Sequence, residues 1–250
     1  GKSRNLRNRV LEHFAQDHRS TKEHELSRQV RRVDWVETAG ELGALLNEAA
    51  AVKSEKPVHN RRLRGSAATW TLRLAAAPDV GGVGRPSRAE IVELDALEPH
   101  EREEVYGTFR DRKAAKRALD EIVRAHRLCV RALGLEDGEG SCFAYQLKRC
   151  KGACVGREPP KLHDTRVRLA LAGLRMKPWP YRGRVAIAER DWRGVEDLHV
   201  LDGWRWLGTV KDLDEARGLR NDDAPFDPDV YRILKRFLAD PAGARVVELG

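Results

Sequence analysis

The cysteines of this 250-residue chain all fall in one short stretch and offer the clearest chemistry. They are Cys129, Cys142, Cys150 and Cys154, spaced C-x12-C-x7-C-x3-C. Four thiolates can ligate an iron–sulfur cluster or a tetrahedral zinc ion. Such clustering argues against a distributed disulfide framework and indicates one local site in a reducing, cytoplasmic setting. Zinc sites more often use two tight pairs of cysteines, and here only the last pair is close, but spacing alone leaves both metals open.

A second group of candidate residues lies in the first quarter of the chain. Glu48 stands in the segment GALLNEA, and Asn60 follows Pro57 with the spacing Glu-x11-Asn. A carboxylate on a rigid helix can hold one divalent cation while other positions stay open for water and phosphate oxygen. A guanidinium such as Arg9 can neutralise charge that builds on a phosphate. Each of these residues could also have no catalytic role. Glu48 could be a solvated helix residue, Asn60 a turn residue and Arg9 a surface charge.

Apolar periodicity and turn residues indicate the elements that must position these groups. The expected helices are residues 6–14, a short one from residue 20, and residues 40–56, 113–128, 163–176 and 227–240. The expected strands are residues 32–38, 69–74, 184–189, 198–210 and 245–249. The first helix should pack one apolar stripe and expose a basic face. The tryptophans of the last third fall at strand spacing and are expected to be core.

The bulk composition is basic, with 47 Lys and Arg against 39 Asp and Glu, a net charge of +8 and a pI near 9.5. A basic chain suggests a polyanionic partner, nucleic acid first, although basic surfaces also serve solubility. No apolar run approaches the roughly 20 residues that cross a membrane.

Three pieces in the correct order resemble a known nuclease family. Residues 1–64 resemble the GIY-YIG nuclease domain in its UvrC-type excinuclease form. The turn at residues 1–3 and the following Arg9 resemble the end of the second motif half and its helix. Glu48 and Asn60 match the later helix and turn. Because no methionine precedes the first residue, the chain is expected to be a fragment, with the motif tyrosines upstream and the fragment itself nearly inactive.

The resemblance implies a role for each matching residue. Glu48 would be the ligand of a single Mg²⁺ or Mn²⁺, and Arg9 would stabilise the phosphate. Lys2 would support the site electrostatically, and Asn60 would hold its geometry by hydrogen bonds. His13 stands where many family members carry a tyrosine, so its role is the least defined.

The resemblance extends beyond the nuclease domain. Residues 147–156 resemble the cysteine-rich region of UvrC proteins, where a 4Fe–4S cluster is proposed, so the sequence favours a cluster over zinc. The basic residues around the cysteines, Lys148, Arg149, Lys151 and Arg157, either bind DNA phosphate or form a solvated loop. Residues 201–210 resemble the C-terminal part of the short Cho branch of this family.

The fold class and function follow as expectations from that likeness. We expect a truncated α/β GIY-YIG domain at residues 1–64 with a small antiparallel sheet flanked by helices. Strands and a helical four-cysteine region should follow at residues 65–160, and a mixed α+β domain at residues 161–250. Relatives of this kind hydrolyse a phosphodiester 3′ to a lesion on DNA loaded with UvrB. Two alternatives stay open, namely a non-catalytic DNA- or protein-binding module, and the C-terminal part of a fusion to an exonuclease related to the polymerase III epsilon subunit.

Overall fold

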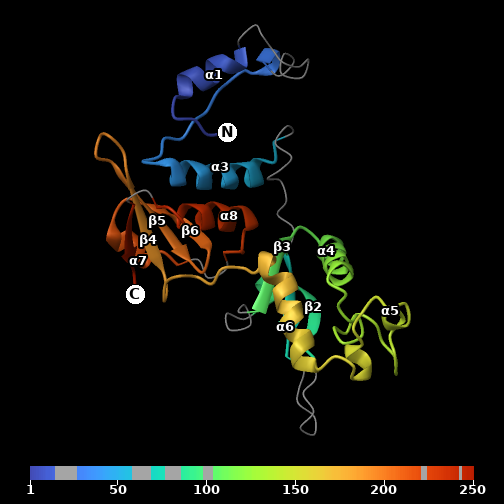
Figure 1. Ribbon diagram of the computed structural model, residues 1–250. Helices are drawn as coiled ribbons and strands as arrows, with labels where there is room; N and C mark the ends of the chain where they lie inside the picture. Colours follow the sequence, from blue (N-terminus) through green and yellow to red (C-terminus); the bar gives the residue numbers. More distant parts are fainter. Residues whose placement is uncertain (15–26, 58–68, 77–85, 98–103, 221–223, 242–243) are drawn as a thin grey trace. The chain divides into compact units, whose positions relative to one another are not determined.

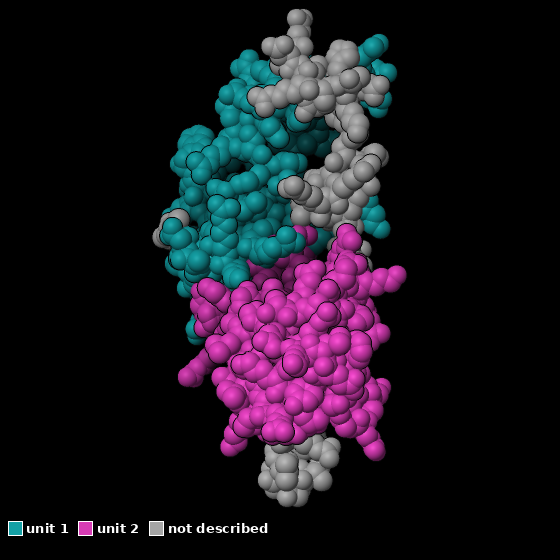
Figure 2. Space-filling view, turned by 45° about the vertical axis from the view of Figure 1, so that its right-hand side comes forward, with its two compact units in different colours: residues 1–64, 183–222, 232–250 teal, residues 65–182, 223–231 magenta. Residues whose placement is uncertain are grey.

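The computed structural model describes residues 1–14, 27–57, 69–76, 86–97, 104–220, 224–241 and 244–250. They form two compact units (Figure 2). Unit 1 comprises residues 1–64, 183–222 and 232–250, and unit 2 comprises residues 65–182 and 223–231. The domain boundaries expected at residues 64 and 160 stay a prediction, because contacts within a unit do not show which segments fold alone. None of the described helices combines the length and apolarity needed to cross a membrane.

Unit 1 contains a four-stranded antiparallel sheet in the order β6-β5-β4-β7. Its strands are β4 (Val185–Arg190), β5 (Glu196–Asp202), β6 (Arg205–Val210) and β7 (Arg245–Glu248). One face packs against the short helix α7 (Leu213–Gly218). The buried residues of this core are Ala186, Ala188, Leu198, Val200, Ala216 and Leu249. The strands expected at residues 184–189 and 245–249 are thereby confirmed.

The opposite face of the same sheet mixes apolar and ionisable side chains. Ile187 lies across from His199, and Glu189 lies across from Asp197, so these four residues share that face. Helix α3 (Glu41–Glu55) runs along the sheet there (Figure 1), where Gly43 approaches His199. This confirms the helix expected at residues 40–56.

The expected single strand at residues 198–210 is wrong, because the chain turns back within it. Asp202 pairs with Arg205 across a two-residue loop, Gly203-Trp204. Both loop residues have positive φ, 54° and 68°, which is the geometry of the tight hairpin turns that match strand twist. The Asp-Gly pair at residues 202–203 was a readable signal for this turn.

The expected strand at residues 32–38 is also wrong, since the structure has irregular chain there. Trp35 and Val36 are 62% and 79% exposed. A strand needs hydrogen bonds from a neighbouring strand. No described residue of the segment 1–64 belongs to a strand, so the expected small sheet is not found in that part of the molecule.

Helix α1 (Leu6–Phe14) confirms the first expected helix, but its apolar stripe is not packed. None of its residues is buried, and Leu11 is about half exposed. Among the described residues no element covers this stripe. The beginning of the short helix expected from Ser20 and the turn with Asn60 lie outside the described residues.

Unit 2 has a three-stranded antiparallel sheet in the order β2-β1-β3. Its strands are β1 (Trp70–Ala75), β2 (Arg88–Glu93) and β3 (Val105–Phe109), of which only β1 was expected. Helices α4 (Arg112–Ala125) and α6 (Pro160–Leu171) pack on it. The buried core residues are Leu72, Leu74, Ala89, Tyr106, Ala115, Leu119, Val123, Leu128, Leu133, Val167 and Leu171.

The other helices for which the structure gives both ends are short, apart from α8. They are η1 (Leu94–Ala96), α5 (Phe143–Gln146), η3 (Ala153–Val155) and η4 (Ala172–Leu174). Helix α8 (Pro228–Phe237) confirms the helix expected at residues 227–240. It begins in unit 2 and ends in unit 1, and Asp227 caps it by accepting a hydrogen bond from the Asp229 amide at 2.8 Å. The cysteine segment is therefore mostly turns, not the helical region expected.

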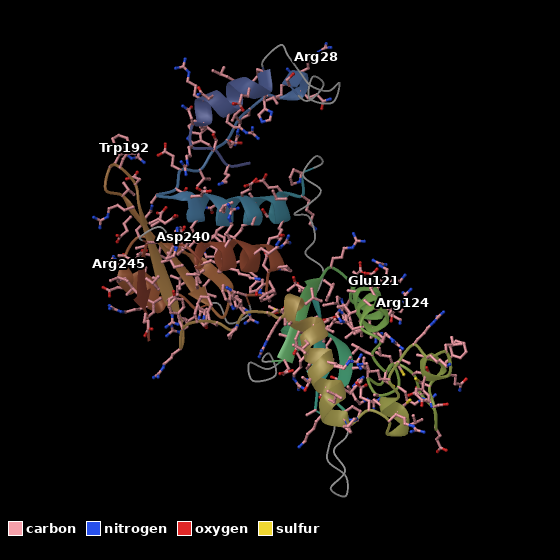
Figure 3. All side chains as sticks on the ribbon, in the orientation of Figure 1. Arg28, Glu121, Arg124, Trp192, Asp240 and Arg245 are labelled. Atoms are coloured by element: carbon pink, nitrogen blue, oxygen red, sulfur yellow. The ribbon has the colours of Figure 1, made fainter. Side chains whose placement is uncertain are left out.

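The tryptophans do not all lie in the core as expected. Trp204 is buried, but Trp192 is 92% exposed at the turn between β4 and β5, where its side chain points away from the sheet (Figure 3). The sequence Asp191-Trp192-Arg193-Gly194 is a turn, with the Asp191 carboxylate accepting from the amides of Arg193 and Val195 at 2.9 Å. A turn residue has no sheet face to pack on, which explains the exposure.

Candidate active site and four-cysteine centre

Glu48 lies in the middle of α3, between residues that pack inward. Leu46, Ala49 and Val52 are buried, whereas the Glu48 side chain keeps 24% exposure. Its Oε1 lies 3.9 Å from the backbone nitrogen of Gly1. The carboxylate is thus accessible to solvent and stands beside the first residue of the chain.

The residues after Gly1 are tied to the beginning of the same helix. Lys2 Nζ donates to Oε1 of Glu41, and Arg4 donates to Oε2 of Glu41 at 3.2 Å. Hydrogen bonds from Lys2 and then Arg4 hold the pKa of the Glu41 carboxyl below its usual range. These exposed pairs are individually weak. They nevertheless align residues 1–4 along α3, from Glu41 to Glu48.

The structure does not join every expected site residue to Glu48. Arg9 pairs with Glu12 on its own helix at 3.3 Å, and both side chains are exposed. His13 is exposed in the last turn of α1. In the described part of the chain no hydrogen bond or ion pair links Arg9 or His13 to Glu48. Lys2 and Glu48 therefore share a helix surface, while the roles of Arg9, His13 and Asn60 stay predictions.

The N-terminus of α3 is fastened by carboxylates that sequence reasoning missed. Glu189 on β4 accepts hydrogen bonds from the amides of Leu42 at 2.9 Å and Gly43 at 2.8 Å. Asp197 on β5 accepts from the amide of Ala39 at 2.7 Å. The first-turn amides of a helix lack partners within the helix, and negative charge near them is stabilising. The residue before α3, Gly40, has no side chain to cap it.

A buried histidine holds the capping carboxylate in place. His199 Nε2 lies 3.0 Å from Glu189 Oε2, and its Nδ1 lies 2.8 Å from Thr209 Oγ1 on β6. The His199 side chain is fully buried. Burial alone would raise the pKa of Glu189, but hydrogen bonds from His199 and the amides of Gly43 and Leu42 outweigh it and keep that pKa low.

Close contact between helix and sheet requires the glycine at position 43. A Cβ placed there would lie 2.8 Å from Cε1 of His199 and 3.2 Å from the Thr38 side chain. Glycine thus lets α3 approach until its amides reach Glu189. The sequence does carry a signal for this arrangement, since ionisable residues stand at inward positions of apolar strands. A buried charge needs hydrogen-bond partners, so such residues predict a polar contact inside the molecule.

The four cysteines of unit 2 converge on one point. The sulfurs of Cys142 and Cys129 are 3.8 Å apart, and those of Cys142 and Cys150 are 3.6 Å apart. The sulfurs of Cys129, Cys142 and Cys154 all lie within 4.8 Å of one another. The structure therefore confirms that residues scattered over this segment form one potential metal-binding centre.

The sulfur spacing provides a test of what the centre could hold. A tetrahedral ion with Zn–S bonds of about 2.3 Å separates its sulfurs by roughly 3.8 Å. The two short sulfur distances match that value. A cluster of several iron atoms needs its ligands farther apart, so these two distances suit one ion. Cys150, however, lies outside the group of three sulfurs that fall within 4.8 Å of one another, so the four sulfurs do not form a complete tetrahedron. The thiolate donor set suits either group.

The protein buries the cysteines, and without a cation this burial disfavours the thiolate form that binds metal. Burial raises the pKa of the Cys129 and Cys150 thiols, and a bound cation would reverse that preference. His163 is fully buried, and its Nε2 accepts a hydrogen bond from the Cys129 amide at 3.1 Å. Gly152, at φ +81°, closes the loop from Cys150 to Cys154, where a Cβ would lie 2.6 Å from the Tyr145 ring.

Comparison with known proteins places these features in one family. Residues 1–61 match the UvrC-like GIY-YIG domain, residues 87–173 the middle domain of UvrC and Cho excinucleases, and residues 184–250 the C-terminal domain of excinuclease Cho. Excinuclease Cho of Salmonella typhi is 38% identical over 236 residues, which are 94% of this chain and 75% of that protein. The chain belongs to the Cho excinuclease family.

Other relatives agree with this assignment. Excinuclease Cho of Escherichia coli K12 is 39% identical over 236 residues, again 94% of this chain and 75% of the relative. The UvrABC system protein C of Gemmatimonas aurantiaca is 33% identical over 159 residues, 62% of this chain and 24% of that protein. No solved structure matches. The predicted family is confirmed: this is a nucleotide-excision-repair endonuclease of the UvrC-like GIY-YIG type, acting on DNA.

The Cho-family match also shows where the capping residues come from. Glu189, Asp197 and His199 lie in the matched Cho C-terminal domain, and the α3 amides lie in the matched GIY-YIG domain. The C-terminal domain therefore contacts the helix that carries Glu48. GIY-YIG nucleases use a divalent metal, and the four-cysteine region of unit 2 is a candidate site for a metal ion or cluster.

Replacing Glu189 by alanine should destabilise unit 1. Loss of the carboxylate leaves two helix amides and the buried His199 without their partner. We expect the free energy of unfolding to fall by about 3 kcal/mol. Chemical denaturation monitored by tryptophan fluorescence measures this change.

A control and a pH series separate this role from a generic charge effect. Glu37→Ala removes an exposed pair with Arg193 and should cost less than about 1 kcal/mol. Because the pKa of folded Glu189 lies below its ordinary 4.5, its contribution is complete above that pH and disappears as pH falls through the lower folded value. Glu189→Gln should lack that acid-side loss. An alanine variant as stable as the Glu37→Ala control would contradict the role.

Proposed function

We propose that the complete enzyme hydrolyses one phosphodiester on the 3′ side of a DNA lesion, on DNA bound by UvrB, with one Mg²⁺ or Mn²⁺ held by Glu48. The observation that carries the proposal is the position of Glu48. Its carboxylate is solvent-accessible and stands on a helix whose N-terminus is fixed by buried carboxylates. It lies beside Gly1, in the turn that resembles the end of the second motif half. A rigidly mounted carboxylate is what a metal-assisted hydrolase requires.

The other expected residues would complete the site around the phosphate. A bound divalent cation supplies positive charge at the reacting phosphate. Lys2, held along α3 by Glu41, adds positive charge next to the Glu48 surface. Arg9 would turn from Glu12 to the phosphate, an exchange that an exposed ion pair permits at small cost. His13 and Asn60 would orient groups at the edge of the site.

For the four-cysteine centre we propose a 4Fe–4S cluster, with zinc as the alternative. The resemblance to UvrC proteins supports the cluster, and the spacing near 3.8 Å supports a single ion. In either case the centre has a structural role, because it ties together Cys129 after α4, Cys142 before α5 and the loop with Cys150 and Cys154.

Glu48→Gln in the full-length protein should abolish incision while leaving DNA binding nearly unchanged. The amide keeps the size of the side chain but loses the negative charge that holds the cation. Incision should fall by roughly 10²–10³-fold, and DNA affinity should change less than about twofold. Incision of a lesion-containing duplex and fluorescence anisotropy measure the two quantities.

Glu55→Gln is the matched control, because Glu55 is an exposed residue of the same helix. It should cut normally. Normal incision by Glu48→Gln would remove Glu48 from the metal site, and equal losses in binding and incision would make it a DNA contact.

Cys150→Ser should release the metal and destabilise unit 2, since the remaining thiolates no longer complete a coordination shell. Elemental analysis of anaerobically purified protein should show iron in the parent chain and little in the variant, and the thermal midpoint should fall. Ser141→Ala, next to Cys142, is the control and should retain metal. A colourless parent protein with stoichiometric zinc would overturn the cluster, and unchanged stability of Cys150→Ser would overturn the centre.

A further inference from the structure

The segment between Cys142 and Cys150 exposes two large apolar side chains. Phe143 is 64% exposed and Leu147 is 45% exposed. They stand four residues apart at the beginning and just after the end of α5, so they project from one face of that turn. Exposed apolar groups that lie close together mark interaction sites more often than single ones do.

The segment that carries Phe143 and Leu147 is held in place at both ends. Cys142 precedes α5, and Cys150 follows it, so both ends are tied to the four-cysteine centre. Within the segment the amide of Leu147 donates to the Phe143 carbonyl at 3.1 Å, and the Arg149 amide donates to the Ala144 carbonyl at 2.7 Å. Arg127 donates to the Lys148 carbonyl at 2.7 Å. Because this segment is already ordered, binding a partner through it costs little conformational entropy.

Three cations flank the apolar pair. Lys148, Arg149 and Lys151 are all exposed. In the described part of the chain none of their charged groups forms an ion pair. By contrast, Arg131 in the same region is neutralised by Glu136 at 2.6 Å. The surface around Phe143 and Leu147 is therefore positively charged without compensation.

Trp192, the most exposed of the described aromatic residues, lacks this combination. The neighbouring Arg193 lies over the Trp192 ring at 5.8 Å and is bound by both Asp191 and Glu37. Its charge is already satisfied, so the turn offers no free cation to a polyanion.

We propose that the Phe143–Leu147 surface, with Lys148, Arg149 and Lys151, binds distorted DNA, its apolar side chains contacting unstacked bases and its cations the flanking phosphates. Aromatic and leucine side chains inserted at base steps are a recurrent way of holding bent or unpaired DNA. Free cations beside them bind phosphate by counterion release. The inference rests on the nuclease function only for its ligand, DNA, and not on the chemistry at Glu48.

The charge pattern favours DNA over a protein partner. A protein-binding surface of obligate type buries a large apolar area with few charges at its centre. Here two apolar groups stand among three unpaired cations on a chain with a net charge of +8. That pattern matches the basic patches with interleaved aromatic groups that bind nucleic acid.

Phe143→Ala should weaken binding to a duplex with an unpaired bubble by about tenfold and binding to a fully paired duplex by less than about twofold. Fluorescence anisotropy with both duplexes measures this selectivity. Phe143→Tyr keeps the ring and should bind within about twofold of the parent. Leu169→Ala is the control, because Leu169 is an exposed leucine of α6 in the same unit.

The combined change Lys148→Ala, Arg149→Ala and Lys151→Ala should weaken both duplexes and lower the slope of log affinity against log salt by about 2 to 3. Lys116→Ala, which removes a cation already paired with Asp120, should change that slope much less. Metal content and the thermal midpoint should stay at the parent values in every variant, since all the changed side chains are exposed.

Several outcomes would overturn the proposal. Parent-like DNA binding by Phe143→Ala would show that Phe143 does not contact bases. An unchanged salt slope in the triple variant would show that the three cations do not contact phosphates. Unchanged DNA binding with altered self-association in sedimentation would assign the surface to protein contacts instead. None of these readouts depends on incision, so failure here and failure of the Glu48 assignment are distinguishable.

Discussion

The capping of α3 by Glu189 is the interaction on which the candidate active site depends. The helix that carries Glu48 has no side-chain cap of its own, and a buried carboxylate on β4 accepts its first amides. His199 and Thr209 fix that carboxylate, and Gly43 lets the helix approach it. A buried charge with three hydrogen-bonded partners is costly to disrupt, because each partner would remain unsatisfied. The position of Glu48 is thereby determined by residues about 140 to 160 positions later in the chain.

This arrangement gives the Cho C-terminal domain a physical role within unit 1. Its sheet has one apolar face against α7 and a second face whose ionisable residues are matched to amides of the GIY-YIG segment. Unit 2 uses a different means of rigidity. There a turn-rich segment with few buried apolar residues is held by four converging thiols, and the same segment presents exposed apolar and basic groups.

Several helices and the cysteine centre could be predicted from the sequence, because each depends on residues that lie close together in the chain. Periodicity predicted α1, α3 and α8, and the cysteine spacing predicted a single centre. The sequence did not predict features that depend on a contact with a residue far along the chain. A strand at residues 32–38 needs a neighbour, and Glu189 shows its role only once α3 lies above it. The Asp202-Gly203 turn was a local signal overlooked in favour of an unbroken apolar pattern.

Amide hydrogen exchange at Leu42 and Gly43 tests the central claim most directly. First-turn amides of an exposed helix have no partner in the helix and exchange readily. If Glu189 caps α3, these two amides should be protected about as strongly as the amides of β4 in the centre of the sheet. They should lose that protection in Glu189→Ala, which removes both acceptor oxygens, while the β4 amides keep most of theirs. Rapid exchange at Leu42 and Gly43 in the unmodified protein would contradict the account.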